Sequence, residues 1–137
     1  MVKLRHEGDY NKQRGLFVDI VVSERSKRFL TVLEQVTNTI SKLDLPLSKI
    51  ILFGSVARGD YTIASDIDLA VITTTTISRV YRKAVTQAIA EFEDIDSMLE
   101  INCFYATDES LTSANHWSDL CTYIKNEGIV LWQKEAF

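Results

Sequence analysis

The stretch from Phe53 to Ile72, FGSVARGDYTIASDIDLAVI, constrains the fold more than any other part of the chain. It continues a short apolar run, Ile50–Phe53, whose strand-forming residues predict a buried strand. A turn-rich segment then leads to a second apolar run that contains two aspartates, Asp66 and Asp68. Because side chains two residues apart on a strand point to the same face of a sheet, these two carboxylates would face one point. The sequence therefore predicts two strands, the second carrying paired acids.

The residues between and on these strands suit phosphate and metal chemistry. Gly54 lets the backbone bend and a ligand approach closely, and Ser55 adds a hydroxyl beside exposed backbone N–H groups, which suits phosphate oxygens. Two neighbouring carboxylates repel each other unless a cation lies between them, and Mg²⁺ prefers such hard oxygen ligands. The alternative, a plain turn and a strand edge with solvated acids, fits poorly because apolar residues flank both aspartates. A site that holds a triphosphate and a metal together is the arrangement that phosphoryl transfer needs.

Composition narrows the class of protein. The chain has 137 residues, which corresponds to one domain, and its 46% hydrophobic and 25% charged content is typical of a globular protein. The net charge of −4 argues against a protein that coats nucleic acid, but it does not exclude a small phosphorylated ligand. We expect a cytoplasmic location and no membrane association, because the N-terminus is polar and no apolar run approaches the length of a membrane span.

The two cysteines, Cys103 and Cys121, lack metal-ligand spacing and stand among apolar residues. They are expected to be small core residues of a reduced protein.

The hydrophobic pattern predicts alternating helices and strands. Apolar spacings of three and four residues indicate helices at 24–43, 78–93 and 113–126. Short apolar runs indicate strands at 50–53, 66–72 and 99–105, whereas 16–22 is either a strand or the start of a helix. Gly128 stands where a helix C-cap belongs, and 129–132 would be an edge strand or a packing tail. The core-facing stripes expected on the second and third helices are Tyr81, Val85, Ala88 and Phe92, then Trp117, Leu120, Cys121 and Ile124. This order indicates a single α+β domain over 1–137, with 1–22 as an N-terminal extension.

The Gly-Ser pair, a spacer and Asp-x-Asp resemble the signature of the nucleotidyltransferase superfamily related to DNA polymerase beta, and in particular its minimal nucleotidyltransferases. The match runs in order over 48–132, and the ending IKNEGIVLW is similar to the tail of these short proteins. The resemblance implies a mixed sheet flanked by helices, the polymerase beta-like palm fold, with a metal site at one edge. It also implies transfer of a nucleoside monophosphate, usually AMP from ATP, to a hydroxyl with release of pyrophosphate.

The resemblance assigns roles by position. Gly54 and Ser55 would hold the triphosphate, with Arg58 and Ser65 as further nucleotide-binding candidates. The pair Asp66 and Asp68 would bind Mg²⁺, with two ions expected. An exposed loop arginine in a solvated pair is an equally good interpretation of Arg58.

A third carboxylate on a neighbouring strand usually completes such a site, and this chain departs from the pattern there. Glu100 and Asn102 both lie between apolar residues and would point to the same face. Chemistry favours Glu100, because an amide can neither accept a proton nor balance a second metal. Counting back from the Thr107-Asp108-Glu109 run favours Asn102 instead, which would make the protein slow or inactive.

The resemblance also suggests acceptors. Many short relatives resemble antitoxins that pair with a HEPN-type ribonuclease toxin and adenylylate it. Others resemble antibiotic-modifying nucleotidyltransferases, but these usually carry an acceptor-binding domain for which 137 residues leave little room. A non-catalytic subunit that neutralises its partner by contact is the alternative from another class, and a homo-oligomer stays open.

Overall fold

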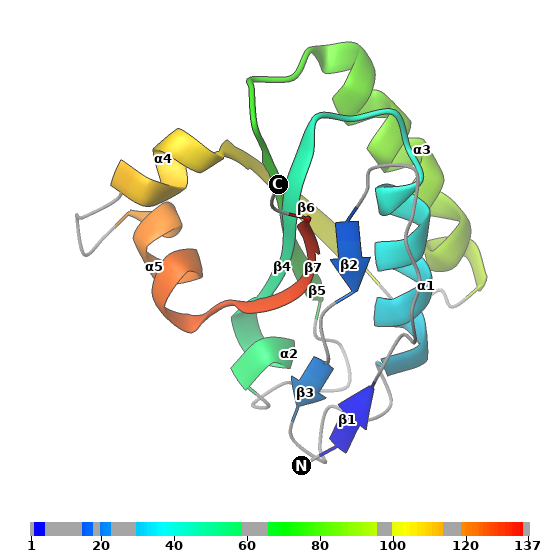
Figure 1. Cartoon of the computed structure of the whole chain (residues 1–137). Coiled ribbons are helices and arrows are strands. Elements are labelled where there is room, and N and C mark those ends of the chain that lie inside the picture. The colour runs from blue at the N-terminus through cyan, green and yellow to red at the C-terminus, as the bar shows by residue number, and fades with distance from the viewer. Residues whose placement is uncertain are drawn as a thin grey trace.

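The computed structural model describes residues 2–4, 15–17, 20–22, 30–58, 66–95, 100–113 and 119–135. A five-stranded sheet in the order β2-β7-β4-β5-β6 forms the centre, with helices on both faces (Figure 1). Its strands are β2 (Gly15–Phe17), β4 (Leu47–Phe53), β5 (Ile67–Thr73), β6 (Ile101–Thr107) and β7 (Ile129–Lys134). Only β5 and β6 run parallel among these pairs. The expected α+β fold with a mixed sheet is therefore confirmed.

The N-terminal segment adds strands that the pattern left undecided. Gly15–Phe17 pairs antiparallel with β7, so β7 is an inner strand and the expectation of an edge strand at 129–132 is wrong. Two further short strands, β1 (Val2–Leu4) and β3 (Ile20–Val22), form a separate antiparallel pair. Part of the segment 1–22 thus belongs to the main sheet rather than lying apart from it.

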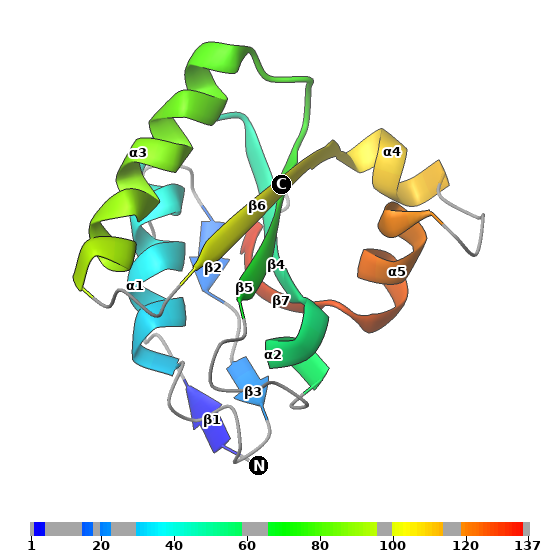
Figure 2. The ribbon, with the colours of Figure 1, turned by 180° about the vertical axis from the view of Figure 1, so that it is seen from behind.

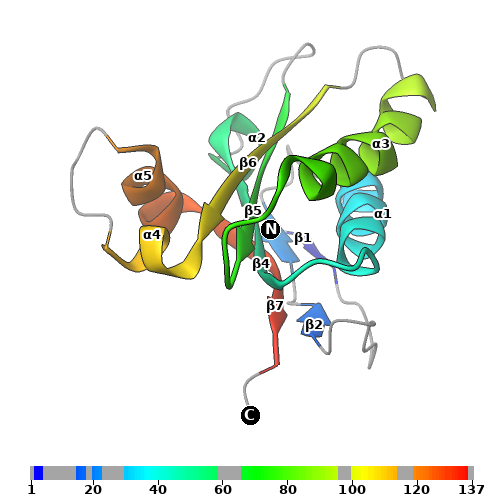
Figure 3. The same ribbon diagram turned by 90° about the horizontal axis from the view of Figure 1, so that it is seen from above.

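The helices form two layers. The helices α1 (Leu30–Ser41) and α3 (Arg79–Ile95) cover one face of the sheet, as Figure 2 shows from behind. On the other face lie α4 (Asp108–Ser113) and α5 (Leu120–Glu127), which the view from above separates clearly from the first layer (Figure 3). The short helix α2 (Gly54–Arg58) follows β4 directly, where the sequence predicted only a turn-rich segment.

Alternation along the strands divides the core into two clusters. Leu69 and Val71 of β5 pack into the cluster beneath α1 and α3, whereas Ala70 and Ile72 pack into the cluster beneath α5. Both faces of β5 are buried, which explains its nearly continuous apolar sequence. The same alternation places Asp66 and Asp68 on the α5 side, because they share the parity of Ala70.

Several helix predictions need correction. The stripe predicted on α3 is wrong at Tyr81, which is 41% exposed, because the face that meets the sheet is centred on Val85 and Ile89. Leu120 is also 41% exposed, since it is the first residue of α5 and lies off the buried Cys121 and Ile124 stripe. The segment predicted as one helix at 113–126 contains the end of α4 and most of α5. Trp117 lies outside the described residues.

Gly128 ends α5 for a reason of space rather than of backbone angle. Its φ of −71° suits any residue, and its N–H donates to the Ile124 carbonyl at 2.9 Å. A Cβ there would lie 2.4 Å from Ile51 Cγ2 and 2.5 Å from the Ile124 oxygen. The junction between α5 and β7 therefore needs glycine to pass close to β4.

The cysteines are free thiols, Cys121 buried and Cys103 half-buried, as predicted. Burial raises the pKa of Cys103 to about 12, so this thiol stays protonated at neutral pH. Among the described residues, no helix is both long and apolar enough to cross a membrane.

Candidate active site

Three adjacent strands bring the predicted site residues to one end of the sheet. β4 ends at Phe53, which lies opposite Asp68 in the antiparallel pair of β4 and β5. The parallel neighbour β6 places Asn102 beside Asp68 on the other side. The start of α2, the aspartate pair and the first residues of β6 therefore meet at a single place, which only the strand register could reveal.

Gly54 is the residue that brings the backbone closest to the acids. Its φ of +77° lies in the left-handed region, where residues with a side chain are strained. A Cβ added to it would lie only 2.3 Å from Asp68 Oδ2. Both the backbone angle and the lack of space therefore require glycine directly after β4.

The side chains of Asp66 and Asp68 converge on one amide. Asn102 Nδ2 donates to Asp66 Oδ2 at 3.1 Å and to Asp68 Oδ1 at 3.3 Å. The two aspartates therefore do project together, as their spacing predicted. The donor that they share is a neutral N–H group, which only partly offsets two negative charges.

The pKa values of Asp68 and Glu100 are both raised. Burial is the main factor that raises the pKa of Asp68; the Asn102 hydrogen bond opposes it, the Asp66 charge adds to it, and the Arg58 charge opposes it. The negative charge of Asp66 is the main factor that raises the pKa of the exposed Glu100. A bound cation would relieve this repulsion, so the charge distribution favours cation binding.

Glu100 and Asn102 occupy different places relative to the pair. Asn102 stands in register with Asp68 on the strand, between the two carboxylates. Glu100 precedes β6, and its carbonyl accepts a hydrogen bond from the Ile67 N–H at 2.8 Å. The position in register with Asp68 thus holds an amide, and the exposed carboxylate of Glu100 comes just before the strand.

Arg58 is fixed by an aromatic residue that the sequence did not single out. Its guanidinium donates to the Tyr123 hydroxyl and lies 5.9 Å from the centre of the Tyr123 ring. Tyr123 in turn makes an edge-to-face contact with Phe53, at 6.4 Å between ring centres. This chain of contacts ties α2 to α5 beside the aspartates. No sequence signal marks Tyr123, because its role depends on a contact 65 residues away.

Of the two serines predicted to bind nucleotide, the structure describes one. Ser55 is half-buried in the first turn of α2, next to Gly54. Ser65 lies outside the described residues.

The donor set fits a hard divalent cation in part. The Asp66 and Asp68 oxygens converge closely enough to share one hydrogen-bond donor, which is the arrangement that a cation needs. The amide of Asn102 can offer an oxygen in place of its N–H group if it turns about its own axis. Within the described ranges, no group of three or more His, Cys, Asp or Glu side chains lies close enough to hold a metal ion.

Comparison with known proteins identifies the family. The model described as Polymerase beta, Nucleotidyltransferase matches residues 34–136, which contain both aspartates and the strands around them. The chain belongs to this nucleotidyltransferase family. No curated protein matches this sequence.

Chains of several solved structures are similar to this one. A chain of a toxin–antitoxin structure with AMP-PNP is 26% identical, with 75% of this chain and 74% of that chain covered and a TM-score of 0.53. A putative nucleotidyltransferase from Sulfolobus solfataricus is 18% identical, with 80% and 85% covered and a TM-score of 0.49. A chain in the complex of tri-AMPylated Shewanella oneidensis HEPN toxin with MNT antitoxin is 24% identical, with 80% and 71% covered and a TM-score of 0.39.

Proposed function

We propose that this nucleotidyltransferase family member uses Mg²⁺ to transfer AMP from ATP to a hydroxyl group of a protein acceptor. The convergence of Asp66 and Asp68 beside the bare backbone of Gly54 carries the proposal. It places a site for hard cations directly beside the start of α2, whose backbone N–H groups can bind phosphate oxygens. Membership of the family supports the reaction type.

Each residue of the site has a proposed task. Ser55 and the backbone N–H groups at the start of α2 bind the triphosphate oxygens, and Arg58, held by Tyr123, adds a positive charge beside them. Asp66 and Asp68 hold Mg²⁺, which when bound neutralises charge on the triphosphate. Glu100 would extend this donor set toward the second ion that the resemblance implies.

Glu100 is also the proposed general base. Its exposed carboxylate beside the aspartate pair suits a group that accepts the proton of an incoming hydroxyl. The acceptor oxygen forms a bond to the α-phosphorus while the bond to pyrophosphate breaks. Glu100 takes the hydroxyl proton, and pyrophosphate leaves with the electron pair.

The acceptor is proposed to be a HEPN-type toxin protein. The structure that shares 26% identity with this chain is a toxin–antitoxin complex with AMP-PNP, an analogue of ATP, which supports both an adenine nucleotide and a protein partner. The chain would then act as an adenylylating antitoxin of the minimal nucleotidyltransferase type.

One observation favours a second function. Asn102, rather than an acid, lies in register with Asp68 and bonds to both aspartates. A chain with this arrangement could keep the fold and neutralise its partner by contact alone. The two functions differ in whether Asp66 and Asp68 are needed.

Label transfer distinguishes them. The purified chain is incubated with a HEPN-type partner, Mg²⁺ and ATP labelled at the α-phosphate, alongside the variants Asp66→Ala and Asp68→Ala. The enzyme hypothesis predicts label on the partner with the wild type and none with either variant. Glu91→Ala, an exposed acid on α3, serves as the matched control and should keep activity. Tight partner binding without label transfer, unchanged in both variants, would support the contact function instead.

A further inference from the structure

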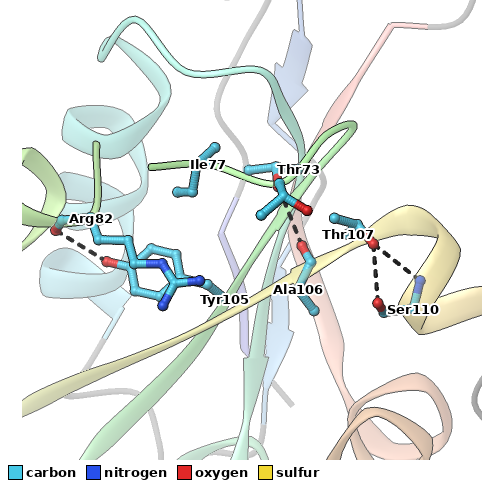
Figure 4. A pocket seen from close by; sticks show the side chains of 8 residues that line it. Thr73, Ile77, Arg82, Tyr105, Ala106, Thr107 and Ser110 are labelled. Atoms are coloured by element: carbon cyan, nitrogen blue, oxygen red, sulfur yellow. Dashed lines mark hydrogen bonds between the residues drawn. The ribbon is translucent and has the colours of Figure 1, made fainter. Parts of the chain in front are cut away.

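A second polar site lies at the opposite end of the sheet from the aspartates. A hollow of about 150 Å³ opens where β5 and β6 end, and its wall includes Thr73, Ile77, Arg82, Tyr105, Thr107 and Ser110 (Figure 4). Thr73 follows Asp68 by five residues on β5, which corresponds to about 16 Å along the strand. The hollow is therefore separate from the candidate active site, and a ligand bound there would be independent of the proposed function.

Arg82 stands in this wall, and an aromatic ring positions its side chain. Its guanidinium lies 5.2 Å from the centre of the Tyr105 ring, an attractive cation–π contact. Over the ranges that the structure describes, no oxygen accepts a hydrogen bond from the guanidinium and no carboxylate pairs with it. The ring holds the side chain without consuming its five N–H groups, which leaves them for a ligand.

The facing wall offers hydroxyl groups. Thr107 donates to Ser110 Oγ at 3.1 Å and accepts from the Ser110 backbone N–H at 3.2 Å. This arrangement leaves the Ser110 hydroxyl hydrogen for another acceptor. Figure 4 shows Arg82 and Tyr105 on one side of the hollow and Thr107 and Ser110 on the other, with Thr73 and Ala106 between them. None of the described residues that line the hollow carries a carboxylate.

The positive charges at the start of α3 also favour an anion in this hollow. The helix begins with Arg79, Arg82 and Lys83, and its first turn has no acidic residue. Cations at the N-terminal end of a helix oppose the helix dipole, so this arrangement costs stability unless an anion is present. A bound anion would interact favourably with both the cations and the dipole.

We propose that this hollow binds a phosphate group. A phosphate has several oxygens that can accept from a guanidinium and from a hydroxyl at once, and arginine binds it in bidentate fashion. The volume is large enough for a phosphate group. Free inorganic phosphate, pyrophosphate and the phosphate of a nucleoside monophosphate share this chemistry.

Titration of the full ¹⁵N-labelled chain at constant ionic strength tests the site. Inorganic phosphate, pyrophosphate and AMP are added in separate arms, and amide and arginine side-chain N–H shifts are followed. Saturable shifts at Thr107, Ser110 and the Arg82 side chain are expected in at least one arm, and that arm identifies the source of the phosphate.

Two arginine variants separate a specific site from general attraction. Arg82→Gln should weaken binding by about tenfold or more, because it removes the guanidinium of the wall. Arg79→Gln removes the same charge from the same helix without altering the wall, so it should weaken binding by no more than about threefold. Both residues are exposed, so unchanged spectra elsewhere would show that the variants remain folded. Equal weakening by both, shifts that never saturate, or shifts confined to 54–58 would each overturn the proposal.

Discussion

Gly54 is the residue on which the geometry of the candidate active site depends most directly. It turns the chain from β4 into α2 with a positive φ and leaves only enough room for the Asp68 carboxylate. Asn102 then bonds to both aspartates from the neighbouring strand. A glycine without a side chain, two acids and a neutral hydrogen-bond donor thus meet at one place.

We predict that Gly54→Ala lowers the free energy of unfolding by about 2 kcal/mol and abolishes nucleotide binding. The strain of a left-handed alanine contributes about 1–2 kcal/mol, and the new methyl group displaces Asp68. Chemical denaturation and titration with AMP-PNP measure the two effects. Ser55→Ala, one residue away on the same helix, should change stability by less than about 0.5 kcal/mol. A Gly54→Ala protein as stable as the wild type would contradict the geometry.

We predict that Asp68→Asn raises the Tm of the metal-free chain at pH 7. Asp68 has a higher pKa in the folded state than its ordinary value of 3.8, chiefly because it is partly buried. The folded state therefore binds more protons between these two pKa values, and wild-type stability falls as the pH rises through that interval. The advantage of the variant should shrink as the pH is lowered below 3.8, where Asp68 is protonated in both states.

Thermal unfolding in a chelating buffer across this pH range provides the measurement. The exposed acid Glu91 supplies the control variant, Glu91→Gln, which should show no comparable dependence. A lower Tm for Asp68→Asn at pH 7 would refute the predicted sign.

We predict that Asn102→Asp makes the chain more dependent on divalent ions. The change removes the N–H donor between the aspartates and adds a third negative charge, so the metal-free protein should lose about 1–3 kcal/mol. Mg²⁺ should then raise the Tm of the variant more than it raises that of the wild type. Glu100→Gln tested in parallel shows whether Glu100 takes part: a lost response to Mg²⁺ would assign it to the metal site. An equal response of Asn102→Asp and wild type would argue against an ion at this position.

At the scale of elements, the strand ends and the helix junctions position the site. The parallel pair of β5 and β6 aligns Asp68 with Asn102, and the antiparallel pair of β4 and β5 aligns Phe53 with Asp68. α5 closes this end of the sheet because Tyr123 contacts both Phe53 and Arg58. Gly128 alone connects α5 to β7, and it lies against Ile51 of β4.

We predict that Gly128→Ala destabilises the chain by about 1–3 kcal/mol, the usual cost of overpacking a filled core. The added methyl group would lie 2.4 Å from Ile51 Cγ2, and β4 would have to move to admit it. Denaturation curves for this variant and for Glu127→Ala, an exposed neighbour, measure the difference. Glu127→Ala should stay within about 0.5 kcal/mol of the wild type. A Gly128→Ala chain with unchanged stability would show that the junction has free space.

At the scale of the whole molecule, the local parts of the fold could be predicted from the sequence and the long-range parts could not. Apolar runs located the strands of 50–53 and 66–72 because both faces of β4 and β5 are buried. The pairing of Gly15–Phe17 with β7 could not be predicted, because a three-residue strand has no periodicity of its own. The position of Tyr81 on α3 was predicted wrongly, because spacing alone does not say which of two adjacent apolar stripes meets the sheet.

Some residues of the candidate site could likewise be predicted from the sequence, and others could not. The Gly-Ser pair and Asp-x-Asp are local patterns, so their residues could be proposed directly from the sequence. Tyr123 and the position of Asn102 depend on contacts across the sheet and between α2 and α5. The choice between Glu100 and Asn102 is a matter of strand register, which composition and spacing do not fix.

The central claim is that Asp66 and Asp68, beside Gly54, form one site for a divalent ion and a nucleoside triphosphate. Titration of the full chain with Mn²⁺ in the presence of AMP-PNP, followed by electron paramagnetic resonance of the free ion, tests it most directly. Wild-type protein should bind Mn²⁺ more tightly when AMP-PNP is present, and Asp66→Ala and Asp68→Ala should each weaken that binding by about tenfold or more. Binding of Mn²⁺ and AMP-PNP that is the same in the wild type and both variants would contradict the claim.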